Sequence, residues 1–377
     1  MTRIYVVRHA EAEGNLYRRI HGWYNSRITE NGKRQIAALA HRFQDIHVDA
    51  AYASDLQRTQ LTAQAVVQPK GLELHIDPGL KEIAMGEYEG MPFGYLDLQW
   101  PEKQAQFASC SPDWKPEGGE SFQEVADRVT TTVMKIARSH PNQTVAIFSH
   151  GAAIKCLLSA VRGKHPSETP GIVHCENTGV SCLDIDGDQV TVVFENDSSH
   201  LPEEIATLAQ QKKSALKYPP VFSWYRTMNM ETEARFYYEA RKEAWENIYG
   251  NLHNFDGSGF LEDARGMSKV CSKSVQCVMD HNDVIGLVQL DTQQYADKSV
   301  GYVPFLYLKP DRRCQGIGVQ LIGEAVCTYR EMGRRCVQLA CSPNNHAAQR
   351  FYHRYGFVKV GEIPGSRAPL DLLEKEI

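Results

Sequence analysis

Two arginines and two histidines follow apolar segments in the first half of the chain. Arg8 and His9 come directly after the apolar run near the N-terminus. His150 follows a second apolar run, and Arg58 begins the helical stretch after a third. Side chains at the carboxyl ends of parallel strands gather at one edge of a sheet. Because guanidinium groups bind phosphate oxygens and a neutral imidazole can attack phosphorus, these four side chains predict phosphoryl transfer. A cationic His150 would join the two arginines in stabilising charge on the phosphoryl oxygens.

Phosphoryl transfer also needs a proton donor for the leaving oxygen. Glu82 lies in the glycine-punctuated stretch 80–90, which predicts a loop. Its carboxyl group could donate this proton and later deprotonate the water that hydrolyses a phosphohistidine. A single histidine after a strand is more often structural, so spacing alone leaves the role of His9 open.

Strand and helix patterns alternate through the first 200 residues. This alternation predicts an α/β domain with a mostly parallel sheet and helices on both faces. The expected strands are 4–7, 49–53 and 144–148, and the expected helices are 30–44, a stretch from about 55, 121–139 and 152–161.

The stretch 201–220 differs from both flanking regions. It is polar, bears lysines and ends in two prolines, which indicates a linker with some helical character. We therefore expect one domain at 1–200 and another at 221–377. The second domain should contain helices at 232–248, 316–332 and 345–355, and strands at 269–279, 284–290, 302–308, 336–341 and 357–361.

Composition narrows the class of protein. A formal net charge of −5 gives no basic surplus for nucleic acid. No apolar run reaches the roughly 20 residues of a membrane span, and the N-terminus does not resemble a signal peptide. The 10 cysteines lack zinc-type pairs and are expected to be reduced thiols. We therefore expect a cytoplasmic enzyme without a metal.

Several motifs in the first half resemble one known family. The signature Arg8-His9-Ala10 is similar to the RHG signature of the histidine phosphatase superfamily, with alanine in place of glycine. The stretch 22–32 resembles the motif that follows it, although Asn25 stands where an acid is usual. Further matches occur in family order at 54–63, 80–90, 118–121, 149–151 and 177. The resemblance implies a three-layer, phosphoglycerate mutase-like fold.

The resemblance also implies roles for single residues. His9 would be the nucleophile and Glu82 the acid and base. His21 and Gly22 are candidate substrate-binding residues at the rim. The phosphate pocket would comprise Arg8, Asn15, Arg58 and His150.

Hydrolysis and mutase activity are both compatible with these motifs. A mutase must shield its phosphohistidine from water, which requires a substantial cover. The segment between Gly90 and Gly118 is short and mostly polar. We therefore favour hydrolysis of a small phosphorylated metabolite, with a mutase-like phosphotransferase as the alternative.

A second candidate site follows the expected strand 302–308. A glycine-bearing turn before a helix presents backbone amides to an anion. The spacing Arg313-x-x-Gly316-x-Gly318 resembles the cofactor-binding motif of the GNAT superfamily of N-acetyltransferases, an α+β fold. A second motif begins at Asn345 and ends at 356–357, as in that family.

The GNAT resemblance implies acetyl-CoA as a co-substrate. Leu306 and Leu308 would align the pantetheine arm and the acetyl carbonyl through their backbone. Asn345 would lie beside the cofactor, and Tyr352 would protonate the departing thiolate. The pyrophosphate would bind the backbone of Arg313, Cys314, Gln315, Gly316, Ile317, Gly318 and Val319.

The general base for the amine acceptor is not evident from the residues. Glu233, Tyr237 and a chain of water molecules are the candidates. The two motif sets together predict a bifunctional enzyme, a phosphatase joined to an acetyltransferase of a small amine. In the alternative, the second domain senses acetyl-CoA and regulates the phosphatase without catalysis. The sequence leaves open whether the protein forms a homodimer.

Overall fold

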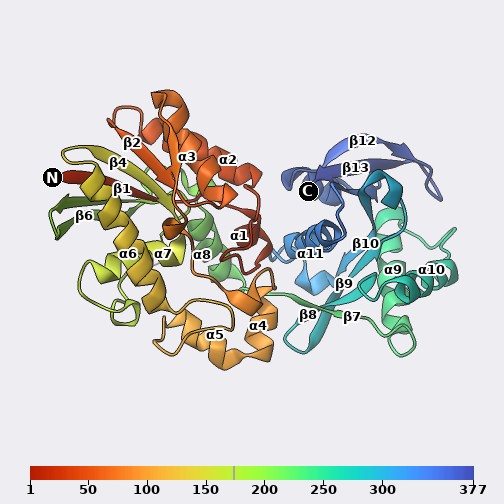
Figure 1. The fold of residues 1–377 in the computed structure, drawn as a ribbon. Coiled ribbons are helices and arrows are strands. Elements are labelled where there is room, and N and C mark those ends of the chain that lie inside the picture. Colours follow the sequence, from red (N-terminus) through yellow and green to blue (C-terminus); the bar gives the residue numbers. More distant parts are fainter. Residues whose placement is uncertain (173–174) are drawn as a thin grey trace. The chain divides into compact units, whose positions relative to one another are not determined.

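A computed structural model describes residues 1–172 and 175–377. The chain divides into two units, Met1–Pro220 and Val221–Ile377 (Figure 1). Each unit has its own sheet, so we treat the two separately.

The first unit is built on a six-stranded sheet with the order β3-β2-β4-β1-β5-β6. Strands β1 to β4 pair in parallel, whereas β5 and β6 are antiparallel. The predicted, mostly parallel sheet is therefore confirmed. The strands are β1 (Thr2–Arg8), β2 (Ala50–Ala53), β3 (Leu74–Ile76), β4 (Thr144–Ser149), β5 (Val180–Asp186) and β6 (Gln189–Asp197).

Helices connect these strands. The helices are α1 (Glu13–Tyr17), α2 (Glu30–Arg42), α3 (Gln57–Lys70), α4 (Phe93–Gln99), α5 (Pro101–Ala108), α6 (Phe122–Ser139), α7 (Gly151–Ala160) and α8 (Thr207–Lys217). The start of α6 illustrates how the sequence sets these bounds. Ser121 accepts a hydrogen bond from the backbone N–H of Glu124, and the Glu124 side chain accepts one from the N–H of Ser121. This capping box satisfies two amides that the helix leaves free.

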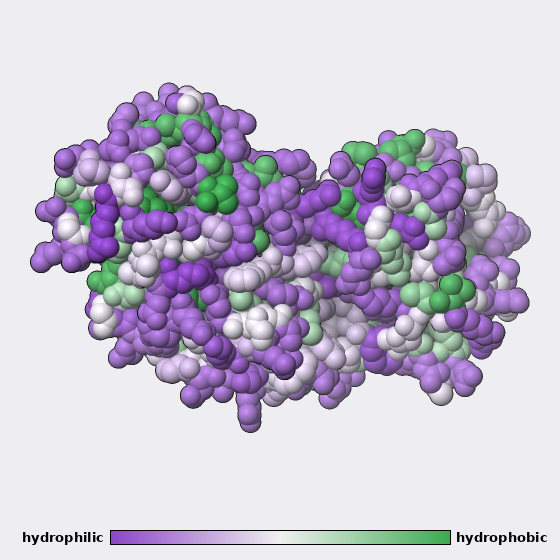
Figure 2. All heavy atoms as spheres, in the orientation of Figure 1, coloured by the Kyte–Doolittle hydropathy of each residue, from purple (hydrophilic) through white to green (hydrophobic). Residues whose placement is uncertain are grey.

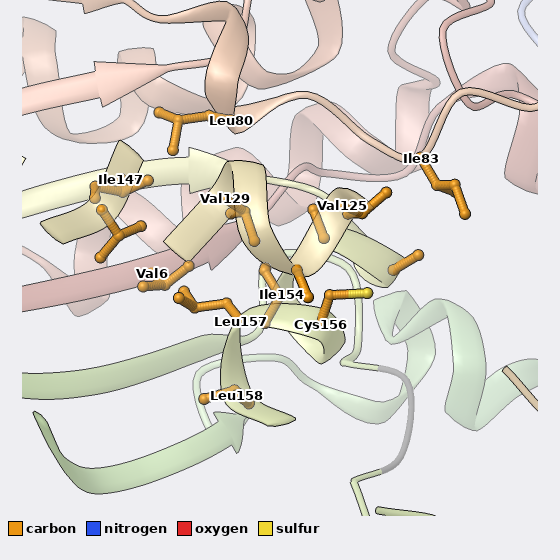
Figure 3. Packing of buried hydrophobic residues seen from close by; sticks show 14 of the residues in the cluster. Val6, Leu80, Ile83, Val125, Val129, Ile147, Ile154, Cys156, Leu157 and Leu158 are labelled. Carbon is orange, nitrogen blue, oxygen red and sulfur yellow. The ribbon is translucent and has the colours of Figure 1, made fainter. Parts of the chain in front are cut away.

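Helices pack on both faces of the sheet because residues of β1 alternate between them. Val6 belongs to a buried cluster with Val129 of α6 and Leu157 of α7 (Figure 3). Val7 belongs to a second cluster, with Leu39 of α2 and residues of α3. The three-layer arrangement holds the carboxyl ends of β1, β2 and β4 in place.

The stretch that we expected to be a linker packs against the first unit. The Glu11 carboxylate accepts a hydrogen bond from the Thr207 hydroxyl at 2.8 Å. The Gln35 amide donates to the same hydroxyl and to the carbonyl of Ile205. Glu176 accepts from the backbone N–H groups of Leu208 and of the next residue. Helix α8 is thus anchored at its N-terminus by buried groups, which a composition-based linker prediction could not reveal.

The second unit contains a seven-stranded sheet with the order β12-β13-β11-β10-β9-β8-β7. Only β10 and β11 pair in parallel. The helices are α9 (Ala234–Tyr249), α10 (Gly257–Val270), α11 (Gly318–Glu331) and α12 (His346–Arg354). The strands are β7 (Trp224–Thr227), β8 (Val275–Asp280), β9 (Asp283–Asp291), β10 (Val300–Leu308), β11 (Cys336–Cys341), β12 (Val358–Ile363) and β13 (Leu370–Glu376).

Two predictions for this unit are wrong in detail. The expected strand 269–279 begins only at Val275, because Lys269 still belongs to α10. That helix escaped prediction because its sequence has three glycines, which lower helix propensity. The Asp256 side chain, which accepts a hydrogen bond from Gly259, helps to start it. The expected last strand, 357–361, corresponds to β12. One more strand, β13, follows it in the chain and lies between β12 and β11 in the sheet.

None of the helices in the described part of the chain has both the length and the apolar run that a membrane span requires. On the face drawn in Figure 2, hydrophilic side chains predominate and the hydrophobic ones form separate patches.

We expect Glu176→Ala to destabilise the docked α8 by about 1–2 kcal/mol, because it removes a carboxylate that caps a helix N-terminus. Hydrogen exchange of the 207–217 amides should become faster. Glu203→Ala is the matched control, since Glu203 forms an exposed ion pair with Lys213 of the same helix. Unchanged exchange in Glu176→Ala would contradict the anchoring of α8.

Candidate active sites

The register of the first sheet brings the predicted phosphoryl-transfer residues to one edge. Arg8 at the end of β1 lies opposite Ser149 at the end of β4. The ring of His9 lies 5.2 Å from that of His150 and 5.7 Å from that of His21, centroid to centroid. The structure thus brings together two histidines that are 141 positions apart in the sequence.

The imidazole of His9 is buried and held in one tautomer. Its Nδ1 lies 2.7 Å from the backbone oxygen of Ala10. A carbonyl oxygen only accepts, so Nδ1 must carry the proton and donate it. Burial, and then the charges of Arg58 and Arg8, hold the pKa of His9 well below its usual range. His9 is therefore neutral, and Nε2 presents a lone pair.

Two arginines give this pocket its positive charge. The Arg58 guanidinium is fully buried and donates to the carbonyl oxygens of His21, Gly22 and Tyr24 at 2.7–3.0 Å. Burial lowers the pKa of Arg58 to about 10, so the group remains charged at neutral pH. The Arg8 guanidinium donates to the carbonyl of Cys175.

Nitrogen atoms without partners remain near His9. The Nε atoms of Arg8 and Arg58 and Nδ1 of His150 are buried without a hydrogen-bond partner among the described residues. Leaving a buried polar group unpaired costs roughly 1–3 kcal/mol. Such a cluster is typical of a site whose partner is an anionic ligand.

His150 is buried and hydrogen-bonded to a serine. Its Nε2 lies 2.8 Å from Oγ of Ser54, the residue that follows β2. We expected a cationic His150, but burial and the charge of Arg58 hold its pKa well below the usual range. His150 is therefore neutral in the protein alone, because two guanidiniums already occupy this low-dielectric pocket. A bound phosphate dianion would favour its protonation.

The predicted rim residues form a hydrogen-bonded group. The Asn15 amide lies 3.2 Å from Nε2 of His21, whose Nδ1 lies 3.1 Å from Oγ of Ser26. Gly22 contributes its carbonyl oxygen to Arg58. A Cβ at Gly22 would come within 2.2 Å of the backbone oxygen of Ile83, so only glycine fits there.

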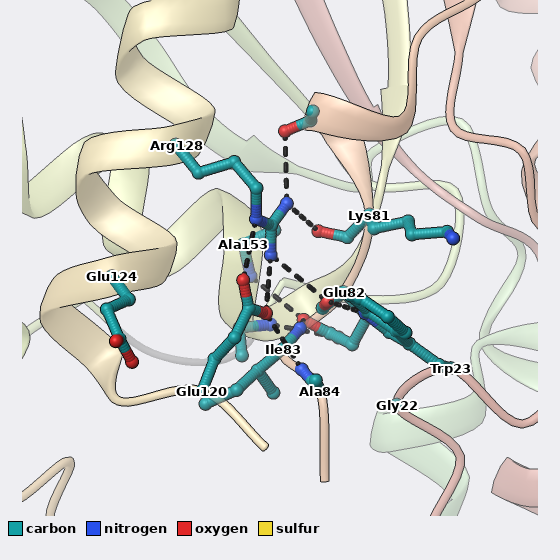
Figure 4. A network of polar contacts seen from close by, with 12 residues as sticks. Gly22, Trp23, Lys81, Glu82, Ile83, Ala84, Glu120, Glu124, Arg128 and Ala153 are labelled. Carbon is teal, nitrogen blue, oxygen red and sulfur yellow. Dashed lines mark hydrogen bonds and ion pairs between the residues drawn. The ribbon is translucent and has the colours of Figure 1, made fainter. Parts of the chain in front are cut away.

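The Glu82 carboxylate lies at the N-terminus of α7, the helix that begins directly after His150. The carboxylate accepts hydrogen bonds from the N–H groups of Ala152, Ala153 and Ile83 at 3.0–3.2 Å. The loop around it is held by Arg128 of α6, which also forms a bidentate ion pair with Glu120 (Figure 4). The same guanidinium donates to the carbonyl oxygens of residues 79, 81 and 82.

The glycine-bearing loop of the second unit presents free amides. Among the described residues, the backbone N–H groups of 314–319 have no hydrogen-bond partner. The helix expected from Gly316 starts at Gly318, because Gly316 has a φ of +78°. Arg313 is held away from the loop by Glu243 at 2.6 Å and by the carbonyl of Leu308. These features are typical of an anion site formed by backbone amides.

Strands β10 and β11 separate along their length. They pair only from Val300–Cys336 to Val303–Leu339. Beyond this point β10 continues to Leu308 and pairs with β9 alone, with an irregularity before Phe305. The backbone edge of Leu306 that faces β11 is therefore unpaired within the described sheet, as extended binding to a ligand requires.

The other predicted cofactor residues lie at α12. The Asn345 side chain accepts from the N–H of Ala348 and so caps this helix. Tyr352 packs against Phe351 and Phe357. Burial raises the pKa of Tyr352 far above its usual value, so its hydroxyl keeps its proton.

Both side chains considered as the general base already have hydrogen-bond partners. Both oxygens of Glu233 are bound by the Arg226 guanidinium, at 2.6 and 2.9 Å, which lowers the pKa of the carboxyl group. Tyr237 is completely buried and donates to the Gln289 side chain. Burial raises the pKa of Tyr237. Within the described residues, no cluster of three or more metal-ligating side chains occurs.

Comparison with known families identifies a family for each of the two units. Residues 4–198 match the histidine phosphatase superfamily (branch 1). The chain belongs to this superfamily. Residues 224–357 match the acetyltransferase (GNAT) family, so the second unit is a GNAT-type domain. The predicted combination of a histidine phosphatase domain with a GNAT domain is confirmed.

Individual relatives of the phosphatase domain carry different names. The chain is 33% identical over 184 residues to a probable phosphoglycerate mutase GpmB of Cronobacter sakazakii, covering 49% of this chain and 85% of the relative. It is 30% identical over 203 residues to phosphoserine phosphatase 1 of Hydrogenobacter thermophilus, covering 54% and 96%. The solved structure of Bacillus stearothermophilus YhfR is 29% identical, with a TM-score of 0.51, and covers 53% of this chain and 99% of its own.

Sequence reasoning missed residues that position the phosphatase site. Ser54 follows β2 directly, so the rule that located His9 and His150 could have found it. The resemblance covers Glu120, in the stretch 118–121, but implies no role for it, and neither Glu120 nor Arg128 follows a strand. Their contacts with the Glu82 loop exist only once α6 packs against it.

The free energy of unfolding should decrease at acidic pH because three histidines stay neutral in the folded protein. His9, His21 and His150 each have a lowered pKa in the folded protein. Below about pH 6.5 the unfolded chain binds protons that the folded chain does not, so the free energy of unfolding falls as pH falls.

Urea unfolding between pH 7.5 and 5.5 checks this expectation. His150→Gln should reduce the decrease between these two pH values by roughly 1.4 kcal/mol in total, because the variant lacks an imidazole that binds a proton only in the unfolded chain. The exposed His47, replaced by Gln, is the control. An unchanged slope in His150→Gln would contradict a neutral buried imidazole.

Proposed function

We propose that the first domain hydrolyses a phosphomonoester through a phosphohistidine at His9. The observation that carries the proposal is the hydrogen bond from His9 Nδ1 to the Ala10 carbonyl, which leaves the Nε2 lone pair available. The unpaired Nε atoms of Arg8 and Arg58 and the unpaired Nδ1 of His150 support binding of the phosphoryl oxygens beside it. The names of the two relatives make small phosphorylated carboxylic acids the first substrates to test.

The reaction would proceed in two steps. In the first, Nε2 of His9 attacks phosphorus, the bond to the ester oxygen breaks and the leaving oxygen takes a proton from the Glu82 carboxyl group. In the second, Glu82 deprotonates a water molecule that attacks phosphorus, and the P–N bond breaks to release phosphate. Arg8 and Arg58 would stabilise charge on the phosphoryl oxygens in both steps.

We propose a role for Glu82 because its position is fixed. Three backbone amides hold the carboxylate at the start of α7. Arg128 holds the surrounding loop through its carbonyl groups. General acid catalysis depends on such positioning, because the proton must be delivered along one direction.

We also propose that the second domain transfers acetyl groups from acetyl-CoA to a small amine. The free amides of 314–319 would bind the pyrophosphate, and the unpaired edge of β10 at Leu306 would align the thioester. The amine nitrogen would attack the carbonyl carbon, the C–S bond would break and Tyr352 would protonate the thiolate. No side chain is assigned as the base, so a water chain remains the candidate.

The variant His9→Ala tests whether the two proposed activities are independent of each other. Phosphate release should fall by at least about 10³-fold, because the nucleophile is lost. Acetyl-CoA consumption should not change, since the acetyl-transfer residues are on another unit. The measurement is a phosphate-release screen over phosphorylated metabolites with acetyl-CoA consumption followed in parallel. His140→Gln is the control, because this imidazole contacts Tyr52 and Gln143 away from the site.

Three results would redirect the proposal. Loss of both activities in His9→Ala would argue against independent sites. Isomerised product without free phosphate would identify a mutase. Acetyl-CoA that alters the phosphatase rate but acetylates no amine would identify the second domain as a regulatory sensor.

A further inference from the structure

A partly buried cation in the GNAT domain, Arg241, lacks a carboxylate partner among the described residues. Arg241 of α9 lies between two aromatic rings, with its guanidinium carbon 3.9 Å from the ring centre of Phe305 and 4.6 Å from that of Phe260. Its Nε donates to the Tyr237 hydroxyl at 2.9 Å, and its NH2 donates to the Gln289 side chain at 2.6 Å. Every one of these partners is electrically neutral.

Three other arginines of the same domain are paired with carboxylates. Arg226 binds Glu233 at 2.6 Å, Arg312 binds Asp280 at 3.0 Å and Arg313 binds a glutamate at 2.6 Å. Arg241 forms no ion pair within 4.0 Å among the described residues, and its NH1 has no hydrogen-bond partner there. The acidic side chain that most affects it electrostatically, Asp263, is exposed.

A partly buried positive charge without a counter-ion is a candidate site for an anionic ligand. Guanidinium groups do not lose their proton in proteins, so the charge persists. Burial lowers the pKa of Arg241, which reflects the loss of hydration. Buried charges are usually paired, and a guanidinium matches a carboxylate through two parallel hydrogen bonds. The free NH1 atom is the position where such an anion would bind.

The location of Arg241 connects it with acetyl transfer. Its guanidinium lies on Phe305 of β10, next to Leu306, whose backbone is the proposed guide for the thioester. Strand β10 has just separated from β11 at this point, after Val303. An amine acceptor that reaches the thioester would therefore pass close to the guanidinium.

We infer that Arg241 binds a carboxylate of the amine acceptor, so that the GNAT domain acetylates an amino acid or a related amino carboxylate. In an α-amino acid the carboxylate and the amine share one carbon, so one end would pair with Arg241 while the other faces the thioester. The inference rests on the acetyl transfer proposed above and narrows its acceptor class. Arg241 would position the substrate, and it takes no part in proton transfer.

The full-length protein with acetyl-CoA and matched acceptors tests this inference. The acceptors are the common L-amino acids and their carboxamides, in which a neutral amide of similar size replaces the carboxylate. We expect kcat/KM for the preferred acid to exceed that for its carboxamide by about 30-fold or more. Arg241→Gln should raise KM for the acid by a similar factor and leave kcat/KM for the carboxamide nearly unchanged.

Two further variants separate binding from folding. Arg241→Lys keeps the charge and should retain part of the preference for the acid. Arg265→Gln, at an exposed arginine of α10, should behave as the wild type. Acetylation without a preference for the acid, or a preference that survives in Arg241→Gln, would overturn the inference.

Calorimetric binding of the same acids and carboxamides, with acetyl-CoA present, distinguishes the inference from the proposed activity. Binding of an acid that is lost in Arg241→Gln, without any acetylation, would support the carboxylate site and reject catalysis. Absence of binding and of acetylation would overturn the inference.

Discussion

The state of His9 depends on a hydrogen bond inside a positively charged pocket. The Ala10 carbonyl holds the proton on Nδ1, while burial beside two guanidiniums prevents a second proton from binding. A protonated imidazole would have no lone pair for phosphorus. The same two guanidiniums that favour an incoming phosphoryl dianion therefore also keep the imidazole nucleophilic. The parallel arrangement of β1 and β4 makes this possible, because it aligns the ends of two strands that carry His9 and His150.

In our proposal the two domains would bind phosphate by different means. The histidine phosphatase domain would surround one phosphoryl group with charged side chains, which suits bond breaking at phosphorus. The GNAT domain would bind a pyrophosphate, which does not react, through backbone amides. Arg241, a partly buried guanidinium without a carboxylate partner among the described residues, lies instead beside the strand that is proposed to align the thioester. In the second domain the backbone amides would therefore anchor the cofactor, whereas Arg241 would select the acceptor.

The sequence predicted what depends on local periodicity and on strand ends. The parallel sheet and the position of His9, His150 and Arg58 follow from those two rules. The roles of Asn15 and His21 required resemblance to a family, because neither lies at a strand end. Docking of α8 could not be predicted, since the Glu11–Thr207 contact joins residues 196 positions apart. Strand β13 was missed because its alternation is dominated by charged residues.

The central claim is that phosphate becomes attached to His9 during turnover. Mass spectrometry of the full-length protein, quenched in alkali within milliseconds of mixing with a phosphatase substrate, tests it most directly. We predict an acid-labile phosphate on the peptide that contains His9, which appears before free phosphate and is absent from His9→Ala. Turnover without any phosphorylated His9 peptide, or the same label in His9→Ala, would contradict the account.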